Sequence, residues 1–208
     1  ITVVHNGYDS DIFNLKSPVN DNILKSYLLN PKSYILFLGT IQPRKNVIKL
    51  VQAFRLLKEQ GYKGKLVVAG NIGWLADDSL EVIKNSPDAA DIVMTGYISD
   101  EARLALYRNA EVYCLPSLYE GFGVPAIEAM AAGAPVAVAN NSSLPEVVGD
   151  AGVLFDERNP ASIAEAIKTL CENRSPWVEK SLARAQKFSW DKCAKETLNV
   201  ISGDYNND

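Results

Sequence analysis

The sequence predicts an α/β fold: a doubly wound parallel sheet of six strands with helices on both faces. Short apolar runs alternate along the chain with amphipathic segments of helical spacing. The central apolar runs lack the polar–apolar alternation of a half-exposed strand, so both of their faces are expected to be buried. Together these two patterns indicate a Rossmann-like domain.

The expected strands are short and mostly apolar. The first, YILFLG, has apolar side chains on both faces, which is typical of a strand in the middle of a parallel sheet. The six expected strands are residues 34–39, 65–70, 91–96, 111–116, 135–140 and 152–156.

Helical periodicity and capping signals place the helices between these strands. After the first strand, apolar residues recur at helical spacing over 47–57, with Asn46 as a candidate N-cap and Gly61 as a candidate end. Ser99 and Pro160 mark the starts of two later helices. The expected helices after the first lie near 78–85, 100–109, 159–173, 176–187 and 190–201, with another beginning near 124 and a short one near 20–29.

The first 33 residues differ in character from the rest. They are extended and rich in turn formers, and Asn6-Gly7 is typical of a turn in a linker. We therefore expect an interdomain linker over 1–33, the Rossmann-like domain over 34–188, and a C-terminal helix and tail over 189–208. This organisation indicates one domain of a longer protein.

Composition excludes several classes of protein. With 47% hydrophobic and 22% charged residues among 208, the chain can bury one sizeable core. A net charge of −4 argues against nucleic-acid binding. No apolar run reaches the roughly 18 residues of a membrane span, and from the opening ITVVHNGYDSD we expect no signal peptide. Three scattered cysteines are typical of reduced thiols in a cytoplasmic protein, and with His5 as the only histidine we expect no metal site.

Three loops at strand ends contain polar or flexible residues. They are GTIQPRKN after the first strand, GYISD after the third and PSLYEGFG after the fourth. In a doubly wound sheet, ligands bind beyond the carboxyl ends of the strands, so all three loops are expected on one binding rim.

The segment EGFGV predicts a phosphate site. Gly121 and Gly123 allow a sharp bend before a helix that begins near Val124. The amides of Phe122, Gly123 and Val124 are then unpaired first-turn donors, and the helix dipole adds to their attraction for an anion.

Two carboxylates flank this phosphate site, and two cations follow the first strand. Glu120 precedes the bend and Glu128 lies one turn into the helix, in an apolar setting that calls for a partner. Carboxylates suit the paired hydroxyls of sugars. Arg44 and Lys45 can offset a diphosphate without a metal. A phosphate with a sugar on either side is a nucleotide sugar.

At this point the chain resembles the GT4 family of retaining glycosyltransferases, which have the two-domain GT-B fold and a Glu-x7-Glu signature. The likeness covers nearly the whole chain, from VVHNGYD through FLGTIQPRKN, LVVAG and GYISDEARLALYRNAEVYCLPSLYEGFGVPAIEAMAAGAPVAVANNSSLPEVVGDAGVLFD to the trailing helices. In that family this region is the C-terminal, donor-binding half.

The resemblance implies a role for each matching residue. Glu120 matches the residue that contacts the hexose hydroxyls, Glu128 the ribose-binding glutamate, and Lys45 the basic residue on the diphosphate. Many members have Gly-Arg where this chain has Gly39-Thr40, and we expect Arg44 to replace that arginine. The resemblance assigns backbone contacts with the sugar and diphosphate to Gly121, Phe122, Gly123 and Val124, and the base-framing loop to Gly96, Tyr97 and Ile98.

The resemblance also implies a reaction and its partners. A hexose would pass, with retention and without a metal or other cofactor, from a nucleoside diphosphate sugar to an acceptor hydroxyl. The GTIQPRKN variant favours bacterial mannosyltransferases of cell-surface polysaccharide assembly, such as that of lipopolysaccharide O-antigen, so GDP-mannose is the expected donor. A missing N-terminal domain would bind the acceptor, a glycan or lipid-linked glycan. The isolated fragment would then be inactive, and the intact protein cytoplasmic, contacting the inner face of the membrane only through the missing half.

Other interpretations use the same residues. Gly121-x-Gly123-x-x-Ala126 fits a loose dinucleotide fingerprint, but the glycines come too late after the strand, and no acid ends the next strand. A non-catalytic nucleotide-sugar-binding module and half of a sugar-nucleotide epimerase stay open. Ser143 and Glu146 fit a capping box, whereas Asn141 and Ser142 could line a sugar pocket.

Overall fold

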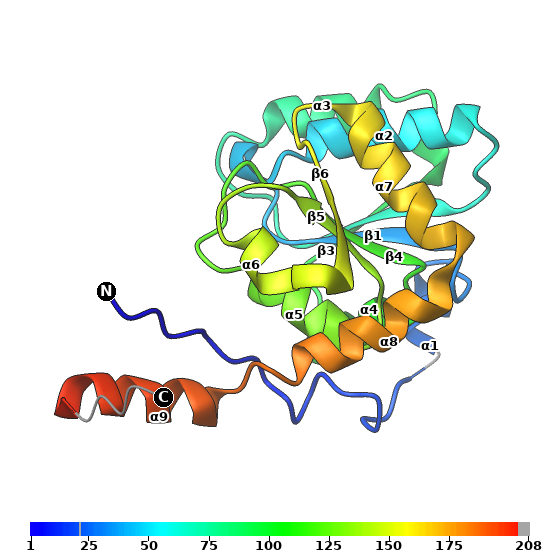
Figure 1. Cartoon of the computed structure of the whole chain (residues 1–208). Helices are drawn as coiled ribbons and strands as arrows, with labels where there is room; N and C mark the ends of the chain where they lie inside the picture. The colour runs from blue at the N-terminus through cyan, green and yellow to red at the C-terminus, as the bar shows by residue number, and fades with distance from the viewer. Residues whose placement is uncertain (21, 204–208) are drawn as a thin grey trace.

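The computed structural model describes residues 1–20 and 22–203. Its centre is a parallel sheet of six strands in the order β3-β2-β1-β4-β5-β6 (Figure 1). The strands are β1 (Tyr34–Leu38), β2 (Lys65–Ala69), β3 (Ile92–Gly96), β4 (Val112–Leu115), β5 (Val136–Ala139) and β6 (Gly152–Phe155). This arrangement confirms the predicted fold class.

Helices cover both faces of the sheet. α2 packs against α3 and α7 on one face, and α5 packs against α4, α6 and α8 on the other (Figure 1). The helices are α1 (Asn22–Ser26), α2 (Val47–Glu59), α3 (Asp77–Lys84), α4 (Asp100–Asn109), α5 (Val124–Ala131), α6 (Leu144–Val148), α7 (Pro160–Glu172), α8 (Arg174–Ala185) and α9 (Trp190–Ser202). Short 3-10 turns lie at Pro43–Lys45, Ala89–Asp91 and Gly149–Ala151.

Burial follows the position of each strand in the sheet. All residues of β1, β4 and β5 are buried, as predicted for strands covered on both faces. The edge strand β3 is partly exposed. Helix α9 has no buried residue, and Figure 1 shows it standing clear of the sheet domain, near the first residues of the chain.

The order of the strands reverses between β1 and β4. These two strands pair only at Ile35 with Val112 and at Leu36 with Tyr113, among the residues described. The topological switch point of the sheet therefore lies between β1 and β4, and ligands of such sheets usually bind beyond the carboxyl ends of the strands at this point. The loops that follow β1 and β4 start there.

One predicted cap is wrong and another is confirmed. Asn46 adopts a left-handed conformation, φ +56°, and within the described chain its side chain makes no capping bond to α2. Its Nδ2 instead donates to the carbonyl oxygens of Pro116, at 3.0 Å, and Glu157, at 2.8 Å, and so ties together the loops after β4 and β6. Ser99 caps α4 as predicted, accepting from the amide of Ala102 at 3.2 Å.

Candidate functional site

The loops after β1 and β4 meet at the switch point. The amide of Leu118 donates to the carbonyl of Arg44 at 2.8 Å, which joins the two loops directly. Arg44 and Lys45 lie in the 3-10 turn before α2, and Lys45 is buried there. The two predicted cations and Glu120 are therefore brought together, although 75 residues separate Lys45 from Glu120 in sequence.

Glu120 is held by three donors. Lys45 Nζ lies 2.6 Å from Oε1, the Ser117 hydroxyl donates to the same oxygen at 2.6 Å, and Arg44 Nη1 donates to Oε2 at 3.0 Å. Burial by itself raises the pKa of Glu120, but the bonds from Lys45, Ser117 and Arg44 outweigh burial and lower the pKa below its usual value. Glu120 is thus an ionised carboxylate that is only 8% exposed.

The β4–α5 loop (residues 116–123) turns into α5 at two glycines. Gly123 has φ +105°, and a Cβ there would lie 2.7 Å from Leu144 Cδ2, so the position favours glycine. Gly123 is also the N-cap of α5, and it has no side chain with which to cover the first-turn amides. The loop thus leads from Glu120, whose carboxylate pairs with Lys45 and Arg44, to the uncapped N-terminus of α5 three residues later.

Residues 141–143 brace this loop from the end of β5. Ser142 Oγ accepts from the Glu120 amide at 3.0 Å, and Asn141 Nδ2 donates to the Ser117 carbonyl at 3.0 Å. The Ser143 hydroxyl lies 3.0 Å from the carbonyl oxygen of Glu120 and 2.8 Å from that of Phe122.

The predicted capping box of Ser143 and Glu146 is wrong. Among the described residues, Ser143 makes no capping bond to α6. Its hydroxyl is engaged by the loop carbonyls, and Glu146 Oε1 lies 2.7 Å from His5 Nε2 instead. Both residues of the local motif are therefore used for contacts between segments that are distant in sequence.

Glu128 occupies a different environment on α5. It is 5% exposed, Tyr107 donates to its Oε2 at 3.2 Å, and Arg103 Nη1 lies 3.5 Å from its Oε1. Burial raises the pKa of Glu128 to about 6, because it outweighs the opposing effects of Arg103 and Tyr107. The site therefore contains one carboxylate that is firmly ionised and one that titrates close to neutrality.

A cavity of about 230 Å³ opens beside β1, β2 and α4. Four predicted residues line it: Gly39, Thr40, Tyr97 and Ile98. Its other lining residues are Leu38, Gly70, Asn71, Asp100 and Arg103. Gly96 lies at the end of β3, where its carbonyl accepts from the amide of Gly70 at 3.0 Å.

Sequence reasoning missed Arg103. Its Nη2 donates to Asp100 Oδ1 at 2.8 Å and its guanidinium lies 4.6 Å from the centre of the Phe13 ring, so it links the cavity to Glu128. In the sequence, Asp100 and Arg103 look like an ordinary surface pair on one helix, and only the packing of α4 against α5 brings Arg103 to Glu128.

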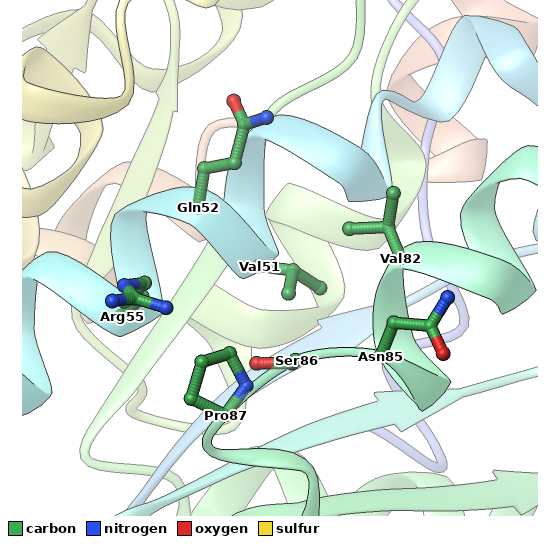
Figure 2. A pocket seen from close by; sticks show the side chains of 7 residues that line it. All are labelled: Val51, Gln52, Arg55, Val82, Asn85, Ser86 and Pro87. Atoms are coloured by element: carbon green, nitrogen blue, oxygen red, sulfur yellow. The ribbon is translucent and has the colours of Figure 1, made fainter.

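A second cleft lies apart from these residues. Figure 2 shows it between α2 and α3. Its volume is about 260 Å³. Its lining residues are Val51, Gln52, Arg55, Val82, Asn85, Ser86 and Pro87, none of which is a predicted site residue.

Of the helices in the described ranges, none has the length and apolar character to cross a membrane.

Comparison with known proteins defines the class. Residues 19–188 match the family described as "Glycosyl transferases group 1", and the chain belongs to this family. It is 38% identical over 183 residues to "O-antigen chain mannosyltransferase B" of Escherichia coli, an alignment that covers 86% of this chain and 48% of that protein. It is 32% identical over 180 residues to "Serotype-specific mannosyltransferase WbdA" of Escherichia coli, covering 82% of this chain and 22% of that protein.

Solved structures match the fold. A glycosyltransferase from Rickettsia africae ESF-5 superposes with a TM-score of 0.86 at 19% identity, over 100% of this chain and 58% of that one. Anabaena Alr3699/HepE, solved in complex with UDP, has a TM-score of 0.82 at 20% identity, over 97% of this chain and 57% of that one. These matches confirm the predicted Rossmann-like, GT-B type of fold. The chain spans about half the length, or less, of the relatives that it matches.

Proposed function

We propose that the chain is the donor-binding half of a retaining, metal-independent hexosyltransferase that transfers mannose from GDP-mannose to an acceptor hydroxyl in polysaccharide assembly. The observation that supports this most is the set formed by Glu120, Lys45 and Arg44 just before α5, together with the cavity that Gly39 and Thr40 line and whose Arg103 pairs with Glu128. The similarity to proteins named as mannosyltransferases supports the choice of sugar.

The donor would lie along the loops that follow β1 and β4. Its diphosphate would accept hydrogen bonds from the amides of Phe122, Gly123 and Val124 at the positive end of α5. The Glu128 carboxylate would accept from the ribose hydroxyls. The cavity between Thr40 and Tyr97 would take the base.

Glu120 would orient the sugar. An ionised carboxylate accepts hydrogen bonds from hexose hydroxyls, and the pairing with Lys45 and Arg44 keeps it ionised despite its burial. The same two cations face the departing diphosphate. Arg44 is the more accessible of the two, with 38% of its side chain exposed, whereas 9% of the Lys45 side chain is exposed.

In the transfer, the bond between the anomeric carbon and the diphosphate oxygen breaks and a bond to the acceptor oxygen forms on the same face. The acceptor proton passes to the leaving phosphate. Charge grows on that phosphate, and Lys45, Arg44 and the α5 N-terminus stabilise it without rearranging. The acceptor would bind to the remainder of the protein, so this chain alone would bind donor without appreciable transfer.

The test is transfer by the intact protein. Incubation with GDP-mannose or UDP-glucose and an α-mannoside acceptor, with the product anomer determined by NMR, should give an α-mannoside with GDP-mannose only. Lys45→Met should reduce kcat by at least about a hundredfold, since it removes a charge aimed at the leaving group. A β-linked product, transfer that depends on a metal, or turnover unaffected by Lys45→Met would overturn the proposal. Donor binding without any turnover in the intact protein would favour a non-catalytic binding module.

A further inference from the structure

Three aromatic rings from distant parts of the chain meet beside the β4–α5 loop. The ring centre of His5 lies 5.8 Å from that of Phe122 and 5.8 Å from that of Phe188, and those two rings lie 5.9 Å apart. The His5–Phe188 and Phe122–Phe188 pairs are edge-to-face, at 73° and 78°, a favourable geometry for aromatic pairs. The N-terminal segment, the loop and the segment between α8 and α9 are thus joined at one point.

Phe122 is the side-chain anchor of the loop. On one side, Gly121 has no described atom within 4 Å of where a Cβ would stand. On the other, Gly123 is in the left-handed region, φ +105°. Neither glycine has a side chain to pack. Besides the bonds of Ser142 and Ser143 to the loop backbone, the Phe122 ring is therefore the side chain that holds the Phe122 and Gly123 amides in place.

His5 is itself held from two sides. Its Nε2 lies 2.7 Å from Glu146 Oε1. Two residues later, Gly7 packs so closely on the start of α9 that a Cβ would lie 2.1 Å from the Trp190 amide nitrogen. The third ring is also fixed, because the Arg184 guanidinium lies 5.3 Å from the centre of Phe188 while its Nε donates to the Val147 carbonyl at 2.9 Å.

A cavity lies between the N-terminal segment and the β4–α5 loop. Its volume is about 310 Å³. Its lining residues are Val3, Val4, His5, Asn6, Gly121, Phe122, Ser143, Glu146 and Val147. His5 and Phe122 both line this cavity, and the contact between their rings adds the N-terminal segment to a point where Phe122 packs against the core that contains Phe188.

We propose that His5 is a positioning residue for the β4–α5 loop: its ring clamps Phe122 against Phe188 and so holds the Phe122 and Gly123 amides in the direction that a diphosphate requires. This inference rests on the proposed function, since it takes those amides as donor contacts. A shift of the N-terminal segment is then transmitted to the donor site through one ring, and donor binding in turn restrains the segment.

The test compares the chain with three variants. His5→Ala removes the ring, His5→Phe keeps a ring but loses the bond to Glu146, and Tyr62→Leu is a control. Tyr62 pairs with Phe54 and Glu111 near the amino ends of β2 and β4, whereas the loop follows the carboxyl end of β4. The readouts are amide hydrogen exchange at Phe122 and Gly123, and the affinity for GDP and GDP-mannose measured by calorimetry.

His5→Ala should speed exchange of the Phe122 and Gly123 amides about two- to tenfold relative to amides of β1, and weaken both ligands by a similar factor. His5→Phe should restore most of the slow amide exchange and most of the ligand affinity, whereas Tyr62→Leu should change neither the exchange rates nor the affinities. The ring signals of His5, the only histidine, should shift when GDP binds. Unchanged loop exchange in His5→Ala, or an equal change in Tyr62→Leu, overturns the clamp whether or not a nucleotide binds. Absence of binding by the unmodified chain counts against the proposed function instead, and the exchange data still decide the clamp.

Discussion

The buried Glu128 should make the free energy of unfolding depend on pH. Burial raises the pKa of its carboxyl from the ordinary 4.5 to about 6 in the folded chain. The folded state therefore binds this proton more tightly than the unfolded state does. The resulting stabilisation is complete below about pH 4.5 and is lost as the pH rises through about 6. A difference of about 1.5 pH units corresponds to about 2 kcal/mol.

Glu128→Gln isolates this effect. Glutamine has the same shape, stays neutral and can still accept the hydrogen bond from Tyr107. At pH 7.5 the variant should be more stable than the natural chain by up to about 2 kcal/mol, and the two should converge near pH 4.5. Glu165→Gln, an exposed site on α7, is the control and should show no such trend.

The free energy of unfolding of both chains is measured by urea denaturation, followed by tryptophan fluorescence, at several pH values between 4.5 and 8. Subtracting the two curves removes the other titrating groups, since they are common to both. A difference that does not change with pH, or a variant that is the less stable chain at pH 7.5, would refute this reasoning. The expected gain also implies that an ionised Glu128 lowers the stability of the chain at neutral pH.

Three further perturbations have defined outcomes. Lys45→Met should destabilise the chain by about 3–5 kcal/mol, because the buried Glu120 carboxylate then lacks its ion pair with Lys45. The double variant with Glu120→Gln should recover most of this loss in the same urea denaturation assay. No recovery would mean that the two residues act independently. Gly123→Ala should lower stability by about 1–3 kcal/mol through its left-handed φ of +105° and its approach to Leu144, whereas Gly121→Ala, in open space, should be nearly neutral, and equal effects would contradict this account. Asn46→Ala should reduce the free energy of unfolding by about 1–3 kcal/mol, since two carbonyl oxygens lose their donor, and a neutral result would show that water replaces the amide.

The sequence is sufficient for the parts of the fold that depend on local patterns. The start of α4 is predicted by Ser99 and the two acidic residues that follow it, which are adjacent in sequence. The predicted helix over 100–109 is observed as Asp100–Asn109. The buried setting of Glu128 follows from its apolar neighbours on α5 and is confirmed. Both predictions use only residues that are close together in sequence.

Local motifs fail where tertiary contacts compete for the same side chain. Asn46 bridges two loops and does not cap α2, and Ser143 serves the loop carbonyls and not α6. The pairing of Arg103 with Glu128 depends on how two helices pack, and that of His5 with Glu146 joins residues 141 positions apart. Neither pairing leaves a periodic or spacing signal in one sequence.

A titration of the isotopically labelled chain with GDP, UDP and ADP tests the donor site most directly. The account predicts amide shifts for GDP centred on Lys45, on residues 96–98 and on residues 123–128, and their loss in Glu128→Ala. Shifts confined to the cleft between α2 and α3, or no shift at these residues with any nucleotide in either the chain or the intact protein, would contradict it.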